Sequence, residues 1–95
     1  SEREGSVGEA VVRWMVEGAV NLAKADYGIA VSGIAGPTGG RPSKPVGTVW
    51  FASKSIDGTG SKRLVFSGNR SMVRTQAIEF SLKQLLHIAK RSNTV

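Results

Sequence analysis

The sequence predicts an α/β domain: a three-layer α/β/α arrangement around a mixed sheet, with about three strands and two long helices in this chain. Three observations carry this prediction. Apolar residues recur at helical spacing near both ends of the chain. Between them, segments 28–33 and 46–54 are apolar at most positions, and the stretch 34–45 that joins them is rich in glycine and proline. Segments apolar on both faces need cover on both faces, which is typical of parallel strands in layered proteins.

A first helix is predicted over 7–25, with Arg13 and Glu17 on its solvent side. Its termination is assigned to Asp26-Tyr27-Gly28, because glycine adopts the left-handed conformation that ends many helices. Trp14 is expected to anchor the core. The stripe expected to face inward is Val7, Val11, Trp14, Met15, Gly18, Leu22 and Ala23.

The second strand, 46–54, is expected to place Trp50 and Ala52 on one face and Val49 and Phe51 on the other. A turn at 56–60 leads to a hairpin strand at 62–67. A last helix is predicted over 70–91 with Asn69 as its N-cap. Its inward positions are Val73, Ala77, Phe80, Leu85 and Ile88, with Ile78 and Leu82 beside them.

Ninety-five residues make one small domain, and three strands against two helices leave the layers incomplete. We therefore expect residues 1–95 to be a single domain that lacks its N-terminal portion or buries surface against a partner. The absence of cysteine is compatible with the cytoplasm, and no signal peptide or membrane span is recognisable. No metal or cofactor is expected. The net charge of +6 is scattered and not interleaved with aromatic residues, which makes nucleic acid an unlikely partner.

Candidate chemistry lies where the first strand ends, the usual position of binding loops in α/β sheets. Gly36, Gly39 and Gly40, followed by Lys44, suit a phosphate group, since glycines let backbone amides approach an anion closely. A glycine-proline crossover that binds no ligand explains the same composition, and both readings stay open at this point. Ser32 can present a hydroxyl beside the loop.

Arg70 lies at the start of the last helix, where a helix N-terminus and an arginine together suit an anion. Two surface arginines without a ligand are the alternative for Arg70 and Arg74. His87, the lone histidine, is expected on the solvated surface late in that helix.

Around this loop the sequence closely resembles the CinA C-terminal domain family, which includes the PncC-type nicotinamide-nucleotide amidases. The resemblance is carried by Val31-Ser32-Gly33-Ile34-Ala35-Gly36-Pro37, Gly39-Gly40, Lys44-Pro45-Val46-Gly47-Thr48-Val49 and Phe66-Ser67-Gly68-Asn69-Arg70. It extends over essentially the whole chain. Asn69 stands where the family usually has Asp. The family's first half, with a Glu-Ser-Cys-Thr-Gly-Gly-like segment that holds the nucleophilic serine and then an activating lysine, has no counterpart here, so the chain resembles the C-terminal part of the domain only.

The resemblance implies hydrolysis of nicotinamide mononucleotide to nicotinate mononucleotide and ammonia by the complete domain, through an acyl-enzyme. In that scheme Gly33, Gly36, Gly39, Gly40 and Lys44 bind the nucleotide. Ser32 is a supporting hydroxyl near the nucleophile or the oxyanion, and Arg70 pairs with the substrate or orients the loop. The chain alone is expected to be inactive, and the family's assembly implies a homo-oligomer. The alternative is a non-catalytic nucleotide-binding or regulatory module linked to competence or DNA damage.

Overall fold

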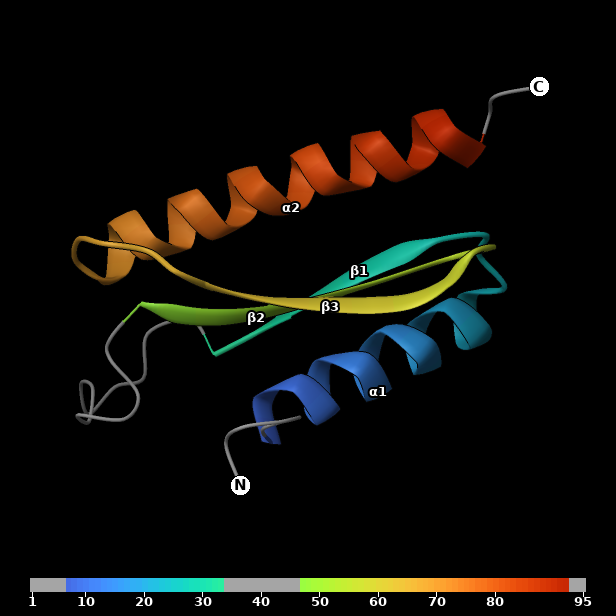
Figure 1. Ribbon diagram of the computed structural model, residues 1–95, viewed down its shortest axis with the longest axis horizontal. Coiled ribbons are helices and arrows are strands. Elements are labelled where there is room, and N and C mark those ends of the chain that lie inside the picture. Colours follow the sequence, from blue (N-terminus) through green and yellow to red (C-terminus); the bar gives the residue numbers. More distant parts are fainter. Residues whose placement is uncertain (1–6, 34–46, 93–95) are drawn as a thin grey trace.

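The computed structural model describes residues 7–33 and 47–92, which form a three-stranded sheet between two helices (Figure 1). The elements are α1 Val7–Ala23, β1 Gly28–Ser32, β2 Thr48–Ser55, β3 Gly58–Val65 and α2 Arg70–Ser92. Their order is the predicted one. Helix α1 covers one face of the sheet and α2 the other, so the α/β class and the three layers are confirmed.

The strands lie in the order β1-β2-β3, and both pairs are antiparallel. A mixed sheet was expected, and the described strands form no parallel pair. Apolar faces report how a sheet is covered and leave the direction of its strands open. Helices cover this antiparallel sheet on both sides, and that cover explains why β1 and β2 carry apolar residues on both faces.

Helix α1 buries a stripe of three valines, Val12, Val16 and Val20, against Ala30 of β1 and Ala52 of β2. The inward stripe predicted from the sequence is wrong, since its large described members are all exposed: Val11, Trp14, Met15 and Leu22. Trp14 is 78% exposed and is no core anchor. The helix is apolar around most of its circumference, so periodicity alone could not choose the face. The branched valines fit closely over the small alanines of the sheet.

Helix α1 ends at Ala23, and Lys24 rather than Gly28 takes the left-handed conformation, with φ of 55°. The Lys24 N–H donates to the Asn21 carbonyl at 3.2 Å, and the Ala25 N–H donates to the Val20 carbonyl at 3.0 Å. These two bonds form a Schellman motif. Gly28 instead begins β1, where an added Cβ would lie 2.9 Å from a Val20 methyl group.

The opposite face of the sheet holds a second core. Val49 and Phe51 of β2 pack against Val73 and Ala77 of α2. The Phe51 ring makes an edge contact with Phe66, with centroids 6.2 Å apart. The alternation predicted along β2 is confirmed, because Trp50 and Ala52 face α1 while Val49 and Phe51 face α2.

The β2–β3 connection is tighter than predicted. Ser55 pairs with Gly58, so the turn contains only Ile56 and Asp57, and β3 begins at Gly58 rather than at residue 62. Gly58 has φ of 121°, a conformation that favours glycine. The Ser55 hydroxyl accepts the Asp57 N–H at 3.1 Å and closes the turn.

Candidate functional site

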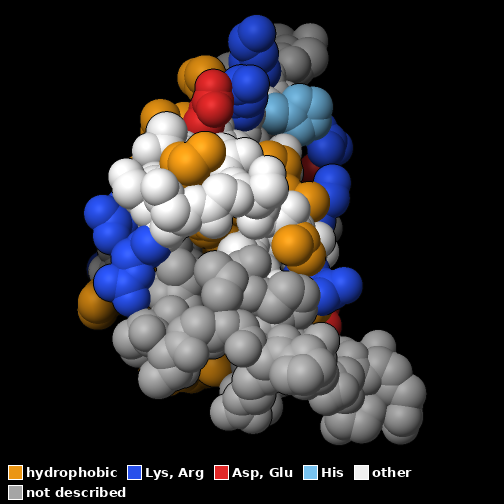
Figure 2. Space-filling view, turned by 90° about the vertical axis from the view of Figure 1, so that its left-hand side faces the viewer, with side chains coloured by type: hydrophobic (Ala, Val, Ile, Leu, Met, Phe, Trp, Pro, Cys, Tyr) orange, Lys and Arg blue, Asp and Glu red, His pale blue; other side chains and the backbone are white. Residues whose placement is uncertain are grey.

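The predicted site residues that the structure describes meet at one end of the sheet. Strand β1 ends there at Ser32 and β2 begins there at Thr48, while α1 and α2 both start at this end (Figure 1). Unpaired N–H groups and the positive end of the helix dipole favour anions at each helix start. Figure 2 shows this end, where Lys and Arg side chains border a largely uncharged surface. The arrangement suits an anionic ligand.

Two glycines fix the points where the chain leaves and re-enters the sheet. Gly33 has φ of 89°, and an added Cβ would lie 3.2 Å from the Thr48 carbonyl oxygen. Gly47 has φ of 97°, and a Cβ there would overlap the Phe66 carbonyl oxygen. The Phe66 N–H also donates to the Gly47 carbonyl at 2.9 Å. Close backbone packing therefore explains these two glycines; Gly36, Gly39, Gly40 and Lys44, predicted to bind phosphate, lie outside the described residues.

Ser32 is half-buried and pairs with Trp50 across the β1–β2 ladder. Side chains alternate along a strand, and Ala30 faces α1, so Ser32 belongs to the α1 face. Arg70 opens the helix that covers the other face and is exposed. The two predicted catalytic residues thus share one end of the sheet but approach it from opposite faces.

Asn69 caps α2, as predicted. Its side-chain oxygen accepts the Met72 N–H at 2.9 Å. The preceding chain is held by Gln76, whose amide donates to the Ser67 carbonyl at 2.9 Å. The ion pairs among the described residues involve other basic side chains and leave Arg70 without one. A guanidinium at a helix start, with no carboxylate partner in 7–33 or 47–92, suits an external anion.

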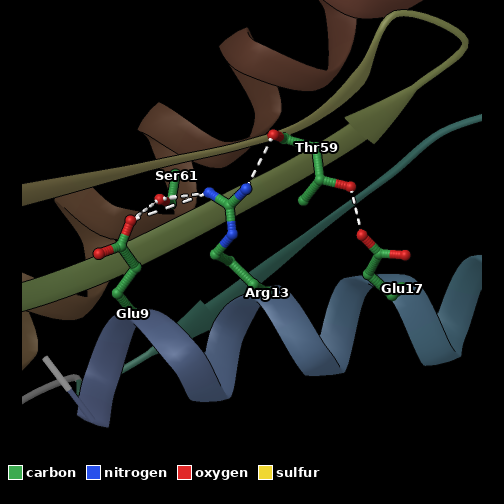
Figure 3. Close-up of polar contacts among 5 residues, drawn as sticks. All are labelled: Glu9, Arg13, Glu17, Thr59 and Ser61. Carbon is green, nitrogen blue, oxygen red and sulfur yellow. Dashed lines mark hydrogen bonds and ion pairs between the residues drawn. The ribbon is translucent and has the colours of Figure 1, made fainter. Parts of the chain in front are cut away.

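The sequence did not predict the polar cluster that joins α1 to β3 (Figure 3). Arg13 donates to the Ser61 hydroxyl at 2.9 Å and to the Thr59 carbonyl at 3.1 Å. The Thr59 hydroxyl donates to Glu17 at 2.5 Å, and Ser61 donates to Glu9. Arg13 and Glu17 were expected to face solvent. Their four-residue spacing with Glu9, opposite alternating hydroxyls in β3, is the signal that could have revealed the contact.

This polar cluster shifts the pKa of Glu17. The hydrogen bond from Thr59 and the charge of Lys54, whose Nζ lies 3.4 Å from the carboxylate, lower the pKa of Glu17 below its ordinary value. The cluster holds α1 against the sheet and lies along β3, away from Ser32 at the end of β1. We therefore assign it a structural role.

The described residues contain no group of three or more His, Cys, Asp or Glu side chains that could hold a metal ion. Within the same residues, neither helix is long and apolar enough to cross a membrane. His87 is exposed on α2, as expected.

Comparison with known proteins connects this geometry to a family. A model of the CinA C-terminal domain matches residues 1–89. The nicotinamide-nucleotide amidohydrolase PncC of Escherichia coli K12 is 50% identical over 84 residues, which are 87% of this chain and 51% of that protein. A crystal structure of the CinA superfamily protein from Enterobacter cloacae matches with a TM-score of 0.76 at 38% identity, covering 90% of this chain and 50% of that one. The competence damage-inducible protein A of Klebsiella pneumoniae matches with a TM-score of 0.72 at 45% identity, covering 81% and 48%.

The chain spans about half the length of the curated PncC relatives it matches. The family match nevertheless extends over most of the chain, including α1, all three described strands and α2 as far as residue 89. The chain therefore belongs to the CinA C-terminal domain family.

Proposed function

We propose that this chain contributes the nucleotide-binding half of an amidohydrolase site that converts nicotinamide mononucleotide to nicotinate mononucleotide and ammonia. The observation that carries the proposal is the 50% identity over 84 residues to the Escherichia coli PncC amidohydrolase. The shared end of the sheet supports it, because two helix starts and Arg70 there favour the phosphate of a nucleotide. A chain without cysteine is compatible with the cytoplasm as the place of the reaction.

In this proposal the glycine loop binds the nucleotide. Gly33, the residue that follows β1, brings the backbone close to the ligand, and Gly36, Gly39, Gly40 and Lys44 hold the phosphate. Arg70, which is exposed and has no ion pair within the part of the chain that the structure describes, contacts the substrate's charge. The role of the Ser32 hydroxyl is to donate a hydrogen bond near the nucleophile or the developing oxyanion.

The nucleophile and its base come from the half of the domain with which this chain does not align. An amide needs an activated nucleophile, and Ser32 has no base beside it among the residues described here. We therefore expect residues 1–95, a single domain without its N-terminal portion, to bind substrate but not to turn it over alone. Exposed apolar side chains such as Trp14, which is 78% exposed, favour a homo-oligomer of the completed domain.

The test measures ammonia release in a completed domain, made by joining the half of Escherichia coli PncC that this chain lacks to residues 1–95. Arg70→Ala removes a charge-assisted hydrogen bond of about 1.5–3 kcal/mol, so kcat/KM should fall at least tenfold. Arg91→Ala is the matched control, because Arg91 is an exposed arginine that pairs with Asp57 at the other end of α2. An unchanged kcat/KM in Arg70→Ala would refute the role of Arg70. Tight nucleotide binding without ammonia release would instead favour a regulatory module.

A further inference from the structure

The packing of α2 against the sheet is interrupted by a cavity. Among the described residues, the second core extends along α2 only as far as Phe80. The next buried residue of the helix is Ile88, about two turns later and beside the β2–β3 turn. Between these two positions, a cavity of about 340 Å³ lies between α2 and all three strands. Small-molecule sites have volumes of about 300–1,000 Å³, so the cavity is large enough to hold a ligand.

The cavity exists because small residues lie beneath this part of α2. Gly60 pairs with Ser53 across the β2–β3 ladder, and both face α2 because Ser53 alternates with Phe51 along the strand. The φ of Gly60 lies outside the left-handed region, and a Cβ added there would meet no atom of the described residues within 4 Å. Neither backbone conformation nor close packing therefore requires a glycine at this position.

One wall of the cavity is aromatic. The rings of Phe51 and Phe80 lie 4.6 Å apart between centroids and are tilted by 58°. Ile29 of β1 adds an apolar side chain to the lining. A flat ring entering the cavity could make offset or edge contacts with both phenylalanines. The apolar part of the lining therefore favours an aromatic ligand.

The remaining lining is polar and carries one positive charge. The half-buried side chains of Ser53 and Gln84 line the cavity, and within 7–33 and 47–92 neither has a hydrogen-bond partner. The Lys62 ammonium lies 5.9 Å from the centre of the Phe80 ring and has no carboxylate partner in the same residues. A hydroxyl, an amide and an ammonium can all donate hydrogen bonds to a carboxylate. One ammonium matches one negative charge, which favours a carboxylate over a doubly charged phosphate.

We propose that this cavity binds an aromatic monocarboxylate, with the ring against Phe51 and Phe80 and the carboxylate toward Lys62 and Gln84. The cavity is separate from the candidate site described above. Gln84 follows Arg70 by fourteen positions along α2, a rise of about 21 Å. The proposal concerns binding alone and does not rest on the amidohydrolase function.

The experiment titrates the 95-residue chain with benzoate, benzamide and acetate, and follows the backbone amides by NMR. Benzamide keeps the ring without the charge, and acetate keeps the charge without the ring. Benzoate should bind with a dissociation constant on the order of 1 mM, as expected for a ligand of about nine non-hydrogen atoms. It should bind at least about fivefold more tightly than either of the others and shift the amide signals of Ser53, Gly60 and Gln84.

Two variants and a control separate the contacts. Lys62→Met should weaken the binding of benzoate at least about fivefold and leave that of benzamide unchanged. Arg63→Met is the matched control, because it removes the same charge from the same strand but pairs with Trp50 on the α1 face. Ser53→Leu fills the cavity and should abolish the binding of benzoate while raising the free energy of unfolding. Lys62 is exposed, so Lys62→Met keeps the test valid even where Ser53→Leu does not fold.

Three results would overturn the proposal. One is equal binding of benzoate and benzamide, or no saturable binding of benzoate. Another is an equal weakening by Lys62→Met and Arg63→Met, which would show a general attraction of anions to a chain with a net charge of +6. The third is a set of shifted amides confined to the end of the sheet that holds Arg70. Since ammonia release is not a readout, a failure of the amidohydrolase proposal leaves this one standing.

Discussion

Gly47→Ala is the sharpest test of how the loop is held at the end of the sheet. With φ of 97°, Gly47 is in the left-handed region, where alanine costs about 1–2 kcal/mol. The new methyl group would also overlap the Phe66 carbonyl oxygen, which is backbone and has no rotamer to change. Moving that carbonyl disturbs the bond from the Phe66 N–H to the Gly47 carbonyl, a loss of about 1 kcal/mol. The expected loss of unfolding free energy is about 2–3 kcal/mol.

The matched control is Gly58→Ala, since Gly58 also has positive φ, 121°, but faces open space. Alanine there costs the backbone strain alone, and its effect on the entropy of the unfolded chain is the same as at Gly47. Urea unfolding followed by circular dichroism should therefore give Gly47→Ala a free energy of unfolding about 1 kcal/mol lower than that of Gly58→Ala. The urea midpoint should be lower by about 1 M. Equal midpoints for the two variants would refute the close approach of Gly47 to Phe66.

Three further predictions concern stability. Lys24→Gly relieves a left-handed residue at the end of α1 and should raise the free energy of unfolding by about 1 kcal/mol in urea titrations; a loss would contradict the Schellman geometry. Asn69→Ala removes the α2 cap and should cost about 1 kcal/mol, while Asn69→Asp, which keeps an acceptor, should be close to neutral; equal losses in both would refute capping. The Thr59 hydroxyl, and after it Lys54, lower the folded-state pKa of Glu17. The ionised Glu17 therefore contributes to the free energy of unfolding above its ordinary pKa of 4.5, and this contribution is lost as the pH falls through the lower folded value. Glu17→Gln should flatten the stability profile in that acid range, and an unchanged profile would contradict the assignment.

The order of the elements could be predicted because local chemistry fixes it. Asn69 marks a helix start, and the two-faced alternation around Trp50 and Phe51 requires helices on both sides of the strand. The face of α1 could not be predicted, because Val12 and Val11 begin equally apolar stripes one position apart. The fit of the valines against Ala30 and Ala52, a tertiary property, decides between them.

For the candidate site too, local sequence features could be predicted and contacts between distant segments could not. Gly33 was predicted from the family motif and Arg70 from its place at the start of a helix. The structure places both residues at one end of the sheet. The direction of the strands does not follow from the apolar faces of β1 and β2, because apolar faces report cover and not the orientation of neighbours. The contact of Arg13 with Thr59 pairs residues 46 positions apart, and no local pattern specifies a partner at that separation.

Ammonia release from nicotinamide mononucleotide tests the central claim most directly. It should be measured for residues 1–95, for the half of Escherichia coli PncC that does not align with this chain, and for the two together. The last measurement requires conditions under which the two halves have been shown to form a complex. The account predicts release only from the two halves together, and a decrease of at least tenfold in kcat/KM when Arg70 is replaced by alanine. Release by residues 1–95 alone would contradict it, and so would a demonstrated complex that releases none.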